Sequence, residues 1–194
     1  MEIWILPALL GVGLAAATGF RTFLPLLMLG LAARFQLFGT DLAPAMAWLE
    51  SPPSLIALGL ATGLELAADK IPAVDHVLSA VGTVVRPIAG AVAAAAAFTT
   101  LDPMVAAIAG LIIGAPAALA FHAAQAGTRV ISSTATAGLG NPVVSILEDL
   151  TAFGTVLVAL LAPLLIPLVL AVLMVLLWRL WRSARPRRVT APGA

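Results

Sequence analysis

The sequence has few charged residues and no cysteine. Only 10% of its 194 residues are charged, whereas a soluble domain typically has about 25%. This is too little polar surface to cover a water-soluble globule, which argues against a soluble enzyme, a disordered regulator and a nucleic-acid-binding protein. The absence of cysteine excludes disulfides, thiolate metal sites and cysteine nucleophiles.

Hydrophobic residues make up 62% of the chain, and the mean hydropathy is +1.12. Because a helix needs roughly 20 apolar residues to cross a bilayer, we predict an all-α membrane protein with about six transmembrane helices, some of them broken. The first apolar stretch is too long for one upright helix and contains Arg21 and Pro25, so it is expected to be tilted or broken. The predicted spans are 3–33, 54–71, 75–98, 104–136, 142–162 and 164–182, with a loop at 34–53.

The number of spans depends on Pro163 and Pro167, which mark either a tight turn between two spans or a kink in one. With six spans both termini are cytoplasmic, and with five the N-terminus lies outside. Basic residues flanking a span stay on the cytoplasmic side, so we place the C-terminus, with its basic and disordered tail 183–194, in the cytoplasm of a cell whose plasma (inner) membrane holds the protein. The basic residues are Arg179, Arg182, Arg185, Arg187 and Arg188, and the expected interfacial anchors are Trp4, Trp48, Trp178 and Trp181.

A faint internal repeat relates the two halves of the predicted transmembrane domain, 1–182. Residues 16–21 resemble residues 124–129, and each segment is followed by a helix with two acidic residues. Three spans per half would make an inverted repeat of 1–98 and 104–182, which is typical of transporters with broken helices. An inverted repeat and a chance similarity stay open as alternatives.

Four sets of polar residues recur at helical spacing within the apolar stretches. A charge at the bilayer centre costs about 2.5–3.5 kcal/mol on insertion scales, so each set is expected to face the bundle interior. In the first set, Thr62, Glu65 and Asp69 share one face beside Lys70. They form either a proton or cation site of two carboxylates or a structural pair of Asp69 with an arginine.

The second set consists of Asp75, Ser79, Gly82 and Arg86. Asp75 comes shortly after Pro72 and suits a helix start, where the helix dipole stabilises an acid. Arg86 lies deeper, and we expect it to form a buried ion pair with an acid on a neighbouring helix.

The third set is the most polar surface of the chain and continues into the hydroxyl-rich segment 133–138. Such a segment unwinds only where it is buried in protein or lines a cavity. We expect either a polar substrate pocket here or tight packing of small residues, with the hydroxyls bonded across helices or back to the chain. Asn141 then suits an N-cap and Pro142 the first helical position. The set itself is His122, Gln125, Arg129 and Ser132 or Ser133.

The fourth set is Ser145, Glu148, Ala152 and Thr155, with Asp149 adjacent. Two buried neighbouring carboxylates repel each other, so one of them is a candidate proton carrier. Alternatively, both lie near the inner interface and favour the N-terminus of their helix.

Arg21 lies between Gly19 and Pro25, with no acid in its own segment. A helix broken at this point would let the guanidinium receive an anionic group or pair with Glu65 or Glu148. Both interpretations require the break to face the interior.

Three motifs, at 19–25, 65–76 and 132–142, are specific when taken together. They resemble a bacterial integral membrane protein family that is catalogued as domain of unknown function 4126. The resemblance covers nearly the whole chain except the tail. It implies a membrane protein and leaves the function open.

The leading hypothesis is a small transporter or flippase with a central polar cavity, for an anionic solute or lipid headgroup, coupled to protons or a cation. The alternatives are a passive channel, an intramembrane lipid-modifying enzyme and a non-transporting assembly factor. For the enzyme, Glu65, Asp69 and Asp75 would hold Mg²⁺ on a diphosphate, but Pro72 interrupts them and no Gly-x-Ser-x-Gly or His-Glu-x-x-His motif occurs.

We therefore expect that the protein is not an enzyme and that it holds no cofactor, with the lipid-modifying enzyme kept as an alternative. The partners expected are the lipid bilayer and a small anionic solute or lipid, without nucleic acid, and a homodimer is an open alternative. The candidate substrate-binding residues are Arg21, His122, Gln125, Arg129, Ser132, Ser133, Thr134 and Asn141. The candidate coupling residues are Glu65, Asp69, Asp75, Glu148 and Asp149, and Lys70 and Arg86 are assigned to structural ion pairs.

Overall fold

Helices account for nearly all of the regular structure. The computed structural model describes the backbone of residues 2–69 and 72–184 and the side chains of residues 4–69 and 77–183. Within these ranges there is no strand, which confirms the predicted all-α class. The helices are α1 (Glu2–Phe20), α2 (Leu24–Arg34), α3 (Pro52–Ala68), α4 (Pro72–Ala96), α5 (Pro103–Thr136), α6 (Asn141–Leu161) and α7 (Ile166–Ala184), with 3₁₀ segments η1 (Leu37–Gly39), η2 (Pro44–Glu50) and η3 (Pro163–Leu165).

Local sequence sets the starts of the helices. The Ser51 hydroxyl accepts a hydrogen bond from the Ser54 amide (3.4 Å), and the Asp102 carboxylate accepts one from the Met104 amide (2.9 Å). Pro52 and Pro103 follow these caps, at the position where a missing N–H costs least. Both α3 and α5 therefore begin where the chain offers a capping side chain followed by proline.

The N-terminal cap of α6 differs from the prediction. Pro142 lies in the first turn as predicted, but Gly140 is the N-cap residue and no side chain caps the helix. The Asn141 side-chain amide instead donates to the Ser133 hydroxyl at 2.9 Å. This bond connects the end of α5 to the start of α6.

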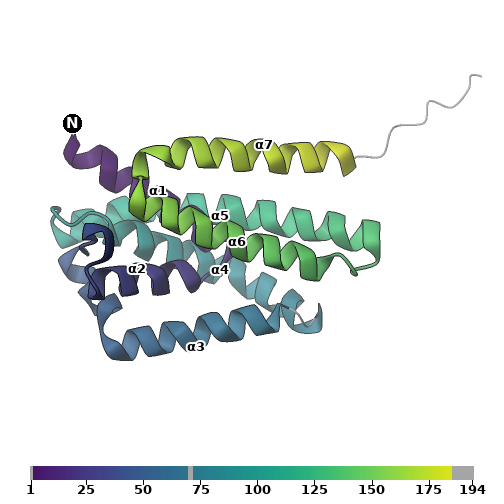
Figure 1. Cartoon of the computed structure of the whole chain (residues 1–194), viewed down its shortest axis with the longest axis horizontal. Coiled ribbons are helices and arrows are strands. Elements are labelled where there is room, and N and C mark those ends of the chain that lie inside the picture. The colour runs from purple at the N-terminus through teal and green to yellow at the C-terminus, as the bar shows by residue number, and fades with distance from the viewer. Residues whose placement is uncertain (1, 70–71, 185–194) are drawn as a thin grey trace, which may run out of the picture.

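The first apolar stretch is broken, as one of the two predicted alternatives required. Helix α1 runs inward from one end of the bundle to its middle, and α2 returns from the middle to the same end (Figure 1). The Trp4 ring, near the start of α1, lies 6.5 Å from that of Phe98, just after α4. At the end of α2, Arg34 donates to the carbonyl of Glu50. The segment is thus a re-entrant hairpin, because its two outer ends lie at one end of the bundle.

The hairpin changes the predicted topology. The N-terminal end of α1 and the C-terminal end of α7 lie at opposite ends of the bundle (Figure 1). The structure therefore does not place both termini on one side, as the six-span prediction required. The physical reason is that the stretch 3–33 turns back on itself in the middle of the bundle.

Residues 163–167 form a tight turn. The short segment η3 reverses the chain, and α7 runs back antiparallel to α6 (Figure 1). This is the turn alternative of the prediction, and the kink is excluded. Helix α7 continues to Ala184, two residues past the predicted end, and tail residues 185–194 lie outside the described part of the chain.

The chain is a multi-pass membrane protein. Four helical segments in the described ranges are long and apolar enough to cross a membrane, and three further apolar helices are shorter. The predicted inverted repeat is not confirmed, because the hairpin in the first half corresponds to the single long helix α5 in the second. The four long segments are Val77–Ala96, Pro103–Thr136, Asn141–Leu161 and Pro163–Ser183.

Helix α1 packs against α4, α5 and α6 in the centre of the bundle. Its residues Ala15, Ala16 and Ala17 are completely buried. Helices α4 and α5 approach closely through small residues, since a Cβ atom at Gly110 would lie only 2.5 Å from the Ala91 carbonyl oxygen. Small residues of this kind allow membrane helices to pack backbone against backbone. This packing holds the tip of the hairpin deep inside the protein.

Candidate functional site

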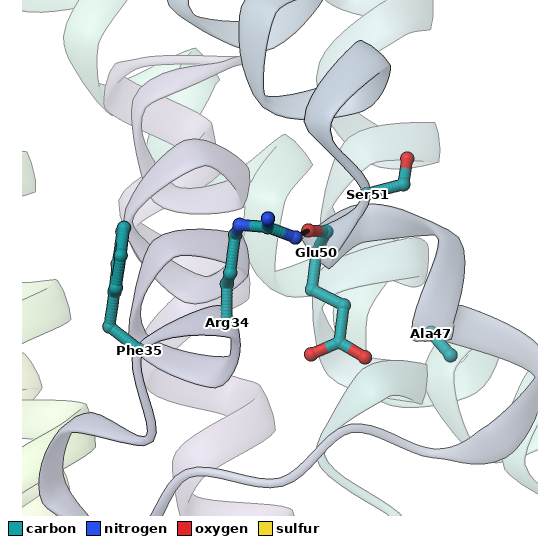
Figure 2. Close-up of a pocket in the computed structure, with 5 residues that line it drawn as sticks. All are labelled: Arg34, Phe35, Ala47, Glu50 and Ser51. Atoms are coloured by element: carbon teal, nitrogen blue, oxygen red, sulfur yellow. Dashed lines mark hydrogen bonds between the residues drawn. The ribbon is translucent and has the colours of Figure 1, made fainter.

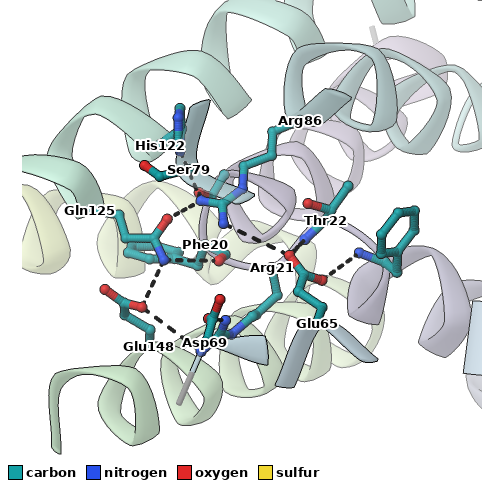
Figure 3. Close-up of polar contacts among 12 residues, drawn as sticks. Phe20, Arg21, Thr22, Glu65, Asp69, Ser79, Arg86, His122, Gln125 and Glu148 are labelled. Carbon is teal, nitrogen blue, oxygen red and sulfur yellow. Dashed lines mark hydrogen bonds and ion pairs between the residues drawn. The ribbon is translucent and has the colours of Figure 1, made fainter. Parts of the chain in front are cut away.

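The break between α1 and α2 exposes backbone groups that a continuous helix would satisfy. Pro25 has no N–H, and its ring is incompatible with the helical position of the Arg21 carbonyl four residues earlier. The last carbonyls of α1 are bonded by side chains from other helices. Arg86 Nη1 donates to the Gly19 carbonyl at 2.7 Å, and Gln125 Nε2 donates to the Phe20 carbonyl at 3.2 Å (Figure 3).

The two backbone amides just before α2 both donate to one carboxylate. The amide of Thr22 donates to Oε1 of Glu65 at 2.9 Å, and the amide of Phe23 donates to Oε2 at 3.2 Å (Figure 3). A negative side chain thus lies at the N-terminus of α2, where the helix dipole favours it. Non-helical backbone is tolerated at membrane depth only when such partners exist, and here charged or amide side chains provide them.

Arg21 is the most deeply buried charge in the described part of the chain, with 0% exposure. Its guanidinium forms ion pairs with Asp69, which follows α3, and with Asp149 of α6. A carboxylate oxygen of Glu148 lies 3.9 Å away, and Nη2 also donates to the Ser145 hydroxyl at 2.9 Å. The expected partner Glu148 is therefore present at longer range, whereas Asp69 and Asp149 form the contacts.

Arg129 joins the same cluster from α5. Its Nη2 lies 2.5 Å from a Glu148 oxygen and 3.0 Å from an Asp69 oxygen. Both carboxylates also lie within 4 Å of Arg21. The arginines of the two similar segments therefore share acids and belong to one network.

Arg86 connects this network to the hairpin. Its Nη2 lies 3.8 Å from Glu65, and its Nη1 donates to the Gln125 side-chain oxygen and to Nδ1 of His122 at 2.8 Å. The expected ion pair of Arg86 with a neighbouring helix is thus present. Because Nδ1 accepts, a neutral His122 has its proton on Nε2, 3.3 Å from the Thr83 hydroxyl. We assign this tautomer from the hydrogen bonds.

Each of the four sets of polar residues predicted from helical spacing has members that face the interior of the bundle. Nine of their polar members are at most 8% exposed, and the Arg129 side chain is 12% exposed. The sequence argument that membrane charges must face the bundle is therefore confirmed for these residues. The nine are Thr62, Glu65, Asp69, Arg86, His122, Gln125, Ser145, Glu148 and Thr155.

Four of the candidate substrate-binding residues lie apart from the network. The segment after Arg129 stays helical to Thr136 and does not unwind. The Thr134 hydroxyl donates to the carbonyl of Val130 at 3.0 Å, and the Thr136 hydroxyl to that of Ser132 at 2.7 Å. Hydroxyls bonded to their own helix need no cavity, which agrees with the alternative of hydroxyls bonded back to the chain; the substrate pocket stays a prediction. The four residues set apart are Ser132, Ser133, Thr134 and Asn141.

Two further candidates cannot be placed. Lys70 and the side chain of Asp75 lie outside the described residues. Among the side chains that are described, no group of three or more His, Asp and Glu residues is arranged to hold a metal ion. Glu65 and Asp69, the other two acids of the magnesium hypothesis, bind backbone amides and arginines.

Sequence reasoning missed the backbone groups of the break and the hydroxyl of Thr83. Thr83 lies four residues after Ser79, so the same helical spacing could have found it. The carbonyls of Gly19 and Phe20 had no sequence signal beyond the break itself. Their partners are 67 and 105 residues away along the chain, a separation that no local pattern reveals.

The network is closed. The cavity lined by Asp69, Arg86, Gln125 and Arg129 has a volume of about 10 Å³, which is room for about one water molecule. The network thus encloses little free volume beside these four residues, and the central polar cavity stays a prediction. Carboxylates, guanidiniums and the broken helix ends fill the place where it was expected.

Arg34 is a useful contrast at the end of the bundle. Its exposed guanidinium reaches the Glu50 carbonyl at 3.2 Å, beside Phe35, Ala47 and Ser51 (Figure 2). A cation in the last turn of α2 also complements the helix dipole. This arginine is solvated and joins α2 to the following loop, unlike the three arginines of the network.

These observations define a helical membrane protein in which a re-entrant hairpin ends in a buried ionic network. The chain belongs to the family described as domain of unknown function 4126, whose model matches residues 8–183. The match confirms the resemblance of the three motifs. No curated protein and no solved structure matches the chain.

Proposed function

We propose that the protein is a small membrane carrier, a transporter or flippase, for an anionic substrate, and that the structure is its closed state. The observation that supports this most strongly is Arg21. It is wholly buried at the tip of a re-entrant hairpin, and it shares Asp69 and Glu148 with Arg129. Ionisable residues at membrane depth are costly and commonly mark substrate or proton pathways.

The balance of charges suggests how binding and coupling would be linked. The described network contains three arginines and four carboxylates, a net charge of −1 when all are ionised. An anion that replaced a carboxylate on Arg21 or Arg129 would leave that acid unpaired in a medium of low dielectric. The released carboxylate would then take up a proton from solution, so that one anion and one proton enter together.

The orientation follows from the hairpin and from the positive-inside rule. The exposed Arg179 and Arg182 lie in the last turns of α7. The start of α1, the loop between α2 and α3 and the start of α5, which include or adjoin Glu2, Asp41, Glu50 and Asp102, lie at the opposite end of the bundle (Figure 1). We therefore place the C-terminus in the cytoplasm of a cell with this protein in its inner membrane and the N-terminus outside. The proposed substrate site lies between them.

The test uses the full chain in liposomes with two probes, fluorescently labelled phosphatidylglycerol for lipid movement and inorganic phosphate with an internal pH dye for proton-coupled solute movement. The wild type should move at least one probe. Arg21→Ala and Glu65→Gln should abolish the movement, while Arg34→Ala, an exposed arginine outside the network, should not. Arg21→Lys keeps the charge but loses the planar fork, so it separates transport from folding.

A purely structural role is the competing proposal, because every contact described for Arg21 is with the protein itself. Under that proposal the wild type moves neither probe, and Arg21→Ala loses only stability. A channel, which would need a pore lined by the third set, is less well supported, because Thr134 and Thr136 beyond that set are exposed and bonded to their own helix.

A further inference from the structure

A long apolar groove lies between α5, α6 and α7. It has a volume of about 430 Å³, and its walls include Ile131, Leu147, Leu173 and Leu177. Helix α7 lies on the outside of the bundle, and only 6% of its most apolar stretch is buried inside the protein. The groove therefore opens toward the lipid.

The floor of the groove belongs to the ionic network, but its polar atoms are already bonded. Glu148 is 6% exposed and binds Arg129, and Gln125 is 3% exposed and donates to Glu148 at 2.7 Å and to Phe20. A polar solute in the groove would find few free partners. The surface that the groove presents suits an aliphatic chain.

The shape also fits an aliphatic chain. The α7 residues that line the groove run from Leu173 to Leu180, which is about 10 Å along a helix. Helix α7 lies along the long axis of the bundle (Figure 1). The groove thus follows the direction that a lipid chain takes in a bilayer.

Positive charge lies at the end of the groove near Leu180. Arg179 and Arg182 are exposed on the last turns of α7, and the Arg182 guanidinium carbon lies 5.2 Å from the centre of the Trp178 ring. Basic residues near a membrane surface attract anionic headgroups, and tryptophan is typical of that depth. The two arginines therefore put positive charge at the depth where the phosphate of a lipid would lie when one of its chains occupies the groove.

We infer that the α5–α6–α7 groove binds one acyl chain of an anionic phospholipid, whose phosphate lies at Arg179 and Arg182. Such a lipid would lie directly against Glu148. If the carrier function proposed above is correct, on which this step rests, the groove is the lateral route from the bilayer to the network. The binding itself does not depend on transport.

The experiment is photo-crosslinking of the full chain in nanodiscs, with phosphatidylglycerol or phosphatidylcholine that has a diazirine in one acyl chain. The expected labels fall on groove residues such as Ile131, Leu147 and Leu177, several-fold more with phosphatidylglycerol. Leu177→Trp should fill the groove and remove the labels. The matched control Leu168→Trp, at a 62% exposed position of α7 outside the groove, should keep them.

A double substitution, Arg179→Gln with Arg182→Gln, tests the headgroup without disturbing packing, because both side chains are exposed. It should lower phosphatidylglycerol labelling to the level of phosphatidylcholine. Equal labelling by the two lipids in the wild type would overturn the assignment of an anionic headgroup. Equal labelling of the groove between α3 and α4, at Leu64 and Val81, would show ordinary boundary lipid and overturn the site.

The outcome is separable from that of the proposed function. Specific labels together with no movement of either transport probe would leave the lipid site standing and contradict the carrier. Absence of groove labels with intact transport would contradict the lipid site alone.

Discussion

Two similar segments of this chain have different structures. Gly19-Phe20-Arg21 ends helix α1, whereas Gly127-Thr128-Arg129 lies inside the unbroken helix α5. Pro25 follows Arg21 by four residues and interrupts the helix there, but no proline follows Arg129 before α5 ends. The comparison shows that the shared motif alone does not cause the break, and Pro25 is a difference in the sequence that follows the two motifs.

The break changes what each arginine can reach. Arg21 leaves the end of a helix in the middle of the protein, is 0% exposed and contacts acids from both α3 and α6. Arg129 extends from the side of α5 and keeps 12% exposure. Arg21, just after a helix end, is therefore completely buried among these acids. Arg129, on the side of a helix, contacts two of the same acids and stays partly exposed.

The prediction with the largest expected effect concerns which of the two segments crosses the membrane. The chain has no cysteine, so single cysteines can be placed at Trp4 and Gln36, before and after the hairpin, and at Met104 and Leu139, at the two ends of α5. Labelling with an impermeant maleimide in right-side-out and inverted vesicles should put the first three positions on one side and Leu139 on the other. The effect is all or none.

If cysteines at Trp4 and Gln36 are labelled from opposite sides, the first stretch crosses the bilayer and the hairpin is wrong. A cysteine at Ser183, near the end of α7, is the control. It should be labelled from the same side as Leu139, since α6 and α7 together return the chain to that end.

The second prediction compares the two arginines. Arg21→Ala removes the arginine that pairs with Asp149 and one of the two arginines near Asp69 and Glu148. It should lower the free energy of unfolding by about 3–5 kcal/mol, the range for a broken buried ion pair. Arg129→Ala should cost less, because its side chain is partly exposed and Arg21 still binds Asp69. Unfolding in mixed detergent and SDS micelles measures both.

A matching substitution makes the result specific to charge. Asp69→Asn combined with Arg21→Ala removes both partners of one ion pair, so the double variant should lose less than the sum of the single variants. Additive losses, or a larger loss for Arg129→Ala, would mean that the break does not make Arg21 the centre of the network.

Much of this site could be predicted from local patterns. Spacings of three and four residues placed Glu65 with Asp69 and His122 with Gln125 and Arg129 on inward faces, because an apolar helix must turn its charges away from lipid. Pro25 and Gly19 indicated a break, and the charge at Arg21 indicated that it faces inward. Helix starts at Pro52 and Pro103 follow from capping chemistry.

The direction of the chain after the break could not be predicted in this way. Whether 3–33 crosses or turns back depends on Arg86, Gln125 and Glu65, which bind the open helix ends from far along the sequence. The hydroxyl segment 132–136 left two alternatives open for a different reason. A serine or threonine that bonds to its own helix has the same sequence as one that lines a pocket, and only the structure separates them.

The last and smallest effect concerns the glycines of the two segments. A Cβ atom at Gly19 would lie 2.6 Å from the Ala118 carbonyl oxygen and 2.6 Å from Cβ of Phe121, both fixed parts of α5. Gly19→Ala should therefore lower the free energy of unfolding by about 1–3 kcal/mol, as overpacking does. The three atoms nearest to a Cβ atom at Gly127 all belong to the Trp181 ring, which can move because α7 is peripheral. Alanine also gains up to about 1 kcal/mol of helix propensity over glycine. Gly127→Ala should be nearly neutral and shift tryptophan fluorescence, whereas equal losses at the two positions would show that α7 is held as firmly as the core.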